Sequence, residues 1–193
     1  MPVNAVKGGG LAGLLAAILF LISTVIDQLA PVQTVYDSPN EYVYQTLSMV
    51  AFLGAVGAVI GFWAVQSRPG RFRRLGTVAA GLTGAGYTVV ALVNAVSIAQ
   101  GERSLVTVRI AAALTLLIGS VILGFIVLRT RLLPWWCGVL LIIAFPLGDV
   151  ANELFRGAVG VLLALLWGSV GLALLARTHS SAEPLSAPAT RLS

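Results

Sequence analysis

Residues 8–30, GGGLAGLLAAILFLISTVIDQLA, form an apolar stretch in which Asp27 is the only charged residue. A bilayer core about 30 Å thick is crossed by roughly 20 apolar helical residues, each adding about 1.5 Å. Five further apolar stretches follow, at residues 42–66, 74–99, 104–128, 133–148 and 157–176. The stretch before the last is the shortest and contains Pro146. The pattern predicts an all-α polytopic membrane protein built as a bundle of six transmembrane helices.

The composition agrees with this fold class. Apolar residues make up 58% of the chain and charged residues only 10%, whereas ordinary soluble domains carry about 25% charged residues. With 193 residues there is room for one helical bundle, which we expect over residues 1–177. The polar, proline-containing segment 178–193 is expected to be a disordered cytoplasmic tail. A GxxxG pair, Gly57 and Gly61, predicts close helix packing.

Basic residues are shared unequally between the two ends of the predicted helices. Nine of the twelve Lys and Arg residues lie on the side that holds both chain ends, and Arg103, Arg109 and Arg156 lie on the other. Cytoplasmic loops of membrane proteins carry the excess of Lys and Arg. We therefore expect both termini to be cytoplasmic. Six of the seven acidic residues lie on the outer side, and Glu183 is the exception.

Several function classes can be excluded from the sequence. The net charge of +5 is spread along membrane borders, where anionic lipid headgroups lie, and it forms no basic patch that would bind nucleic acid. The lone Cys137 excludes an internal disulfide, and His179 in the tail cannot ligate a haem inside the bundle. No HExxH motif or Cys/His cluster is present. We expect no metal and no cofactor, and the lipid bilayer is the predicted partner.

Polar side chains inside the predicted helices gather toward their outer ends. They are Ser23, Thr24, Asp27, Gln45, Ser48, Asn94, Ser97 and Arg109. Polar groups in lipid need partners, so we expect these residues to face one another around a water-accessible cavity open to the outside. Asn94 is expected to bond a neighbouring helix. Arg109 either holds an anionic group, pairs with Asp27 or Asp149, or extends to the lipid headgroups.

The segment PLGDVANELFRG, residues 146–157, has the richest chemistry. Asp149, Asn152, Glu153 and Arg156 follow one another at helical spacing, which predicts that they share one face. Pro146 and Gly148 are expected to kink or interrupt the helix before that face. Two carboxylates one turn apart in a low-dielectric site disfavour double ionisation, so they could bind a proton or cation or act as a general acid. The alternative is a solvated interfacial helix whose acids pair with Arg156.

Three features give the chain a family resemblance. They are the outer loop after the first helix, the basic joint RPGRFRRLG at 68–76, and the joint RTRLLPWW at 129–136. With these features the chain resembles a group of small six-helix bacterial membrane proteins of unassigned function. The resemblance implies a location in the bacterial plasma (inner) membrane and implies no reaction.

Three functional hypotheses follow. In the first, an acidic outward-facing cavity binds or transports a small molecule or cation, with Asp149 and Glu153 at its charged centre. In the second, the same carboxylates catalyse acid/base chemistry on a lipophilic substrate, as in the cyclisation of an isoprenoid by integral-membrane terpene cyclases, whose motifs are not matched here. In the third, the protein is an assembly or regulatory partner. The other candidate ligand-binding residues are Asp27, Asn94, Arg109, Asn152 and Arg156. The sequence leaves the oligomeric state open.

Overall fold

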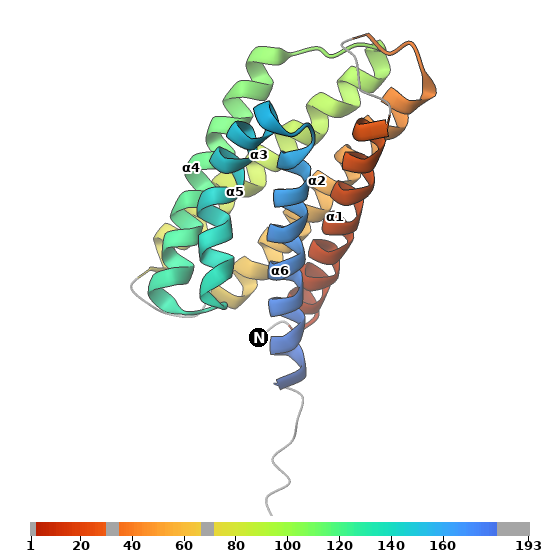
Figure 1. Cartoon of the computed structure of the whole chain (residues 1–193). Helices are drawn as coiled ribbons and strands as arrows, with labels where there is room; N and C mark the ends of the chain where they lie inside the picture. Colours follow the sequence, from red (N-terminus) through yellow and green to blue (C-terminus); the bar gives the residue numbers. More distant parts are fainter. Residues whose placement is uncertain (1–2, 30–34, 67–71, 181–193) are drawn as a thin grey trace, which may run out of the picture.

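The described residues of the computed structural model form six helices (Figure 1). They are α1 (Val3–Leu29), α2 (Pro39–Gln66), α3 (Arg73–Gln100), α4 (Val106–Thr130), α5 (Trp135–Leu154) and α6 (Ala158–Ser180). The structure describes residues 3–29, 35–66 and 72–180, except for the side chains of Asp149, His179 and Ser180. Within these residues the only β pairing is an isolated bridge between Val35 and Glu102.

The helices have the length and composition of membrane spans. Five of them are long and apolar enough to cross a bilayer, namely α1, α2, α3, α4 and most of α6. The apolar part of α5, Trp135–Gly148, is shorter. The chain is therefore a membrane-embedded, multi-pass helical protein.

The helices form a closed ring. Each helix packs against its neighbour in sequence, α6 packs back against α1, and α2 makes a lighter contact with α6. Successive helices run antiparallel, so α1 begins and α6 ends at the same end of the bundle (Figure 1). We call this the basic end, because its helix termini carry Lys7, Arg73, Arg74, Arg129, Arg131 and Arg177. The opposite end, with the joints 35–38, 101–105 and 155–157, is called the mouth end.

The interior is built from small residues, and the large aliphatic residues face outward. Ala51, Ala55 and Ala58 of α2 are fully buried. Leu15 and Ile18 of α1, by contrast, are about half exposed. In lipid no hydrophobic force drives helices together, so close backbone approach through small residues supplies the packing energy. This distribution suits a protein whose outer surface contacts acyl chains.

The predicted packing of the GxxxG pair is confirmed where α1 crosses α2. A Cβ atom added to Gly61 would lie 2.7 Å from the Cα of Gly9, and one added to Gly57 would lie 2.7 Å from the Cβ of Ala12. No side chain fits at either glycine, which fixes the crossing point of the two helices.

The structure corrects two predictions for the fifth and sixth helices. Of the two outcomes expected at Pro146, an interruption does not occur, because α5 continues through it to Leu154. Phe155 is extended, with φ −136°, so Arg156 lies beyond the helix and the four polar residues do not share one helical face. Helix α6 continues to Ser180, so residues 178–180 of the predicted tail 178–193 are helical, and the remainder, 181–193, lies outside the described residues.

Candidate functional site

A cavity of about 650 Å³ opens at the mouth end, and residues from all six helices line it. Its volume lies within the range of about 300–1,000 Å³ that is typical of small-ligand sites. The five residues predicted to bind a ligand all line it, namely Asp27, Asn94, Arg109, Asn152 and Arg156. The structure therefore brings together polar groups from α1, α3, α4, α5 and the α5–α6 joint.

The two residues predicted as the acidic centre are placed differently. Glu153 is exposed and is not among the residues that line the cavity. The side chain of Asp149 lies outside the described part of the structure. Glu153 therefore lies on the exposed surface near the end of α5.

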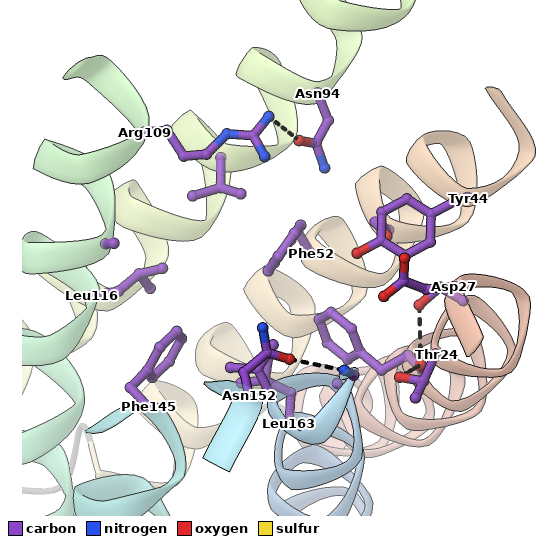
Figure 2. A pocket seen from close by; sticks show the side chains of 18 of the residues that line it. Thr24, Asp27, Tyr44, Phe52, Asn94, Arg109, Leu116, Phe145, Asn152 and Leu163 are labelled. Atoms are coloured by element: carbon purple, nitrogen blue, oxygen red, sulfur yellow. Dashed lines mark hydrogen bonds between the residues drawn. The ribbon is translucent and has the colours of Figure 1, made fainter. Parts of the chain in front are cut away.

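Arg109 is held by Asn94 on the neighbouring helix. Its Nη2 donates a hydrogen bond of 3.1 Å to the Oδ1 of Asn94 (Figure 2), whose side chain is 2% exposed. The expected bond from Asn94 to a neighbouring helix is thus present. Because α4 begins at Val106, Arg109 lies in its first turn, where the helix dipole disfavours a cation. The amide oxygen offsets part of that cost and fixes the guanidinium at the cavity wall.

Arg103, which the sequence places on the outer side without a predicted role, also lines the cavity. It lies in the α3–α4 joint, which Gly101 turns with φ +70° and which the Tyr36 N–H anchors through a 2.9 Å bond to the Gly101 carbonyl oxygen. The buried Nε of Arg103 has no hydrogen-bond partner among the described residues. Arg103 is close enough to Arg109 to repel it electrostatically. No sequence signal separates this inward-facing arginine from a solvated one.

The α5–α6 joint forms the opposite rim. Gly157 takes a left-handed conformation with φ +81°, and its N–H donates to the Oδ1 of Asn152 at 2.8 Å. The side-chain amide of Gln28 donates to the carbonyl oxygen of Arg156, so the end of α1 holds the α5–α6 joint in place. These bonds position the Arg156 residue at the rim, and they commit the Asn152 oxygen to a structural role.

The described charges of the cavity are mainly basic. Arg103, Arg109 and Arg156 line it, whereas Asp27 is the one acidic lining residue whose side chain the structure describes. Asp27 lies close to Tyr44, and Figure 2 shows these two on the other side of the cavity from Arg109 and Asn94. The described lining charge is therefore mainly basic, and Asp149 of the predicted acidic centre lies outside the described side chains.

Gln45 offers a polar group that the protein itself does not use. Its side chain is 1% exposed, lines the cavity, and has an Nε2 without a hydrogen-bond partner among the described residues. The neighbouring hydroxyls of Ser23 and Thr24 are already bonded to the Phe20 carbonyl oxygen, at 3.0 and 2.8 Å. A buried amide without a partner costs about 1–3 kcal/mol, so this donor is suited to a ligand or an ordered water.

Aromatic rings close the end of the cavity that lies farthest from the mouth end. Phe52 packs against Phe20 and Tyr87, with ring centroids 5.1 and 5.8 Å apart, and Tyr87 packs against Phe145 and Trp167 at 6.1 and 5.4 Å. We call these five residues the aromatic floor. The void on the far side of Trp167 measures only about 10 Å³, the size of a single water. The cavity thus ends near the middle of the helices.

Metal binding and known proteins give no further guide to the site. Within residues 3–29, 35–66 and 72–180, no three His, Cys, Asp or Glu residues lie together as a metal-binding group. Comparison with models of protein families, with curated proteins and with solved structures gave no match. The chemistry of the cavity lining is therefore the basis on which a function can be inferred.

Proposed function

We propose that the protein binds a small amphiphilic anion in the mouth-end cavity, with a carboxylate or phosphate group at the arginines and an apolar body on the aromatic floor. The observation that carries this proposal is the convergence of Arg103, Arg109 and Arg156 on one cavity. Guanidinium groups match carboxylate and phosphate oxygens in charge and in fork geometry.

Electrostatics favours an anion between the two arginines of the α3–α4 region. Arg103 and Arg109 repel each other, and like charges interact strongly where water is partly excluded. An anion that accepts hydrogen bonds from both would relieve this repulsion. It would also give the Arg103 Nε a partner. The Nε2 of Gln45, which has no partner among the described residues, supplies a further donor deeper in the cavity.

The lower part of the cavity suits an apolar group. Phe20, Phe52 and Phe145 line it, and aromatic side chains commonly form the walls of ligand sites. A ligand that is charged at one end and apolar at the other would satisfy both halves of the cavity. A free inorganic anion would leave the floor unused, and a cation would meet the three arginines.

The transporter and assembly-partner hypotheses each require a structural feature beyond a binding cavity. A transporter needs a second state in which the aromatic floor opens toward the basic end. In this structure, buried residues such as Leu141 and Val170 fill the bundle beyond the floor, so binding is the activity that the geometry supports best. The assembly-partner hypothesis does not account for a 650 Å³ cavity with unpaired donors.

The membrane orientation belongs to the same proposal. The basic end is assigned to the cytoplasm by its excess of Lys and Arg, with α5 as a sixth crossing that links the basic end to the mouth end. The mouth end then faces outward from the plasma (inner) membrane. The cavity accordingly takes its ligand from the outer side or from the outer leaflet.

One observation favours acid/base catalysis as a second candidate function. Three rings of the aromatic floor, those of Phe20, Phe52 and Phe145, line the cavity, and aromatic rings would stabilise a carbocation, as the cyclisation of an isoprenoid requires. Asp27 lines the cavity, but it lies at the mouth end, away from the floor, so the initiating acid is less well placed. Conversion of an isoprenoid substrate by the native protein, and its loss in Asp27→Asn, would support catalysis over binding.

The binding proposal is tested with ligands that differ only in their head group. The purified protein is heated in detergent with octyl phosphate, octanoate, octanol or octyltrimethylammonium, and its midpoint of unfolding is recorded. A ligand present at 100 times its Kd stabilises the folded state by about 2.7 kcal/mol. We expect the two anions to raise the midpoint and the alcohol and the cation to have little effect. Equal shifts for all four compounds would contradict the proposal.

A further inference from the structure

Four residues of α4 and α5 both line the cavity and lie exposed on the surface of the bundle. Ile110 and Leu114 of α4 line the cavity, yet they are 56% and 55% exposed. Ala113 of α4 and Pro146 of α5 are also both lining and exposed. We call these four residues the portal. They are apolar, and three of them lie in a helix long and apolar enough to span the membrane.

The packing of α5 explains why the portal exists. Near the basic end α5 lies against α4. The contact is so close that a Cβ added to Gly124 of α4 would lie 2.6 Å from the carbonyl oxygen of Gly138 of α5. Near the mouth end α5 lies against α6, where a Cβ added to Gly148 would lie 3.1 Å from the Cα of Val159. The helix therefore moves from one neighbour toward the other along its length. Pro146 lies on this upper part, where the missing hydrogen bond permits a bend.

We infer that the ligand enters through the portal from the membrane, and that it is a single-chain lipid with one anionic head group. This inference rests on the binding function proposed above and specifies its ligand. In lipid, exposed apolar residues around an opening contact acyl chains rather than water, so the portal admits a chain without exposing it to solvent. The head group reaches Arg103 and Arg109 while the chain lies on the aromatic floor or extends out through the portal.

The size and charge of the site select this occupant. A volume of about 650 Å³ accommodates a head group with part of one chain, and the portal lets the remainder stay in the bilayer. A water-soluble anion would need only the mouth, and the four apolar portal residues would then serve no binding purpose. A neutral lipid would offer no charge to the three arginines, which outnumber the one described acidic lining residue, Asp27.

The inference is tested with a reporter placed in the portal. Cys137→Ala removes the single native thiol, after which Ala113→Cys or Ala111→Cys is labelled with a small fluorophore. Both alanines are exposed on α4, but only Ala113 lines the cavity, so Ala111 is a matched control. The labelled proteins are reconstituted in phosphatidylcholine vesicles that contain a fatty acid with a nitroxide on its chain, or its methyl ester.

If the inference holds, the nitroxide fatty acid quenches the label at residue 113 with a saturable component that is absent at residue 111. The methyl ester should quench both labels weakly and without saturation. Arg103→Gln or Arg109→Gln should abolish the saturable component, and having two variants guards against misfolding of either one. Equal, non-saturable quenching at both positions would overturn the portal. If the octyl anions still stabilised the protein in detergent, the binding proposal would survive that result, whereas loss of both effects would reject binding itself.

Discussion

The indole N–H of Trp167 donates a 3.0 Å hydrogen bond to the hydroxyl of Tyr87 inside the bundle. The two residues belong to α6 and α3, which lie on opposite sides of the ring of helices. Both side chains are almost fully buried, at 2% and 0% exposure. The bond therefore spans the interior at the level where the cavity ends. It links two residues of the aromatic floor that lie on opposite helices of the ring.

Tyr87→Phe should destabilise the protein, because it leaves a buried indole N–H without a partner. We expect a loss of about 1–3 kcal/mol, measured as a lower midpoint of thermal unfolding in detergent. Tyr42→Phe makes the same chemical change at an exposed residue and should cost less than about 0.5 kcal/mol. Equal losses for the two variants would show that the Trp167 bond does not stabilise the floor.

Gln45→Met should separate stability from binding. Replacing a buried amide whose nitrogen has no partner with an apolar group of similar size is expected to be neutral or stabilising by about 1 kcal/mol. The affinity for octyl phosphate should nevertheless fall, because the ligand loses a donor. Gln100→Met, at an exposed position at the end of α3, should change neither quantity. A destabilised Gln45→Met with unchanged affinity would mean that the amide serves the fold.

Glu41→Ala should weaken the start of α2. Glu41 accepts a 2.9 Å bond from the Ser38 N–H and a further bond from the Ser38 hydroxyl, and the first of these is the bond that the Glu supplies in an S-x-x-E capping box. Loss of a cap costs about 0.5–2 kcal/mol, measurable as a lower unfolding midpoint. Glu41→Gln should retain most of the stability. If it loses as much as Glu41→Ala, the stabilisation comes from the charge and not from the cap.

Gly61→Ala and Gly81→Ala should have effects of opposite sign. A Cβ at Gly61 would meet the Gly9 backbone at 2.7 Å, whereas a Cβ at Gly81 has nothing within 4 Å. Gly61→Ala must therefore push α1 and α2 apart and should cost about 1–3 kcal/mol. Gly81→Ala gains helix propensity, worth at most about 1 kcal/mol. Thermal unfolding in detergent measures both, and a stable Gly61→Ala would contradict the assigned α1–α2 contact.

Helices could be predicted from sequence because their signal is continuous. A stretch such as residues 8–30 has the length and composition that only a membrane span requires, so α1 through α4 and α6 follow from hydropathy alone. The end of α5 could not be predicted in this way. Its last turns are polar, and whether a helix continues past Pro146 depends on the close approach of Val159 to Gly148, which is a tertiary contact.

The cavity was predictable as a gathering of polar residues, but its charge was not. Asn94 and Arg109 stood out as polar groups within apolar stretches, and polar groups in lipid must meet one another. Arg103 lies in a loop, and its inward position depends on the turn at Gly101 and on the bond between the Tyr36 and Gly101 backbones. Glu153 is at helical spacing from Asp149, yet its side chain is exposed because α5 ends one residue later.

The central claim is that Arg103 and Arg109 bind the anionic head group. Calorimetric titration of octyl phosphate into the native protein, Arg103→Gln, Arg109→Gln and the control Arg74→Gln tests it directly. Arg74 is an exposed residue at the basic end. A hydrogen bond to a charged group is worth about 1.5–3 kcal/mol, so each cavity variant should bind roughly 10- to 100-fold more weakly and Arg74→Gln should bind like the native protein. Unchanged affinity in both cavity variants, or an equal loss in Arg74→Gln, would contradict the claim.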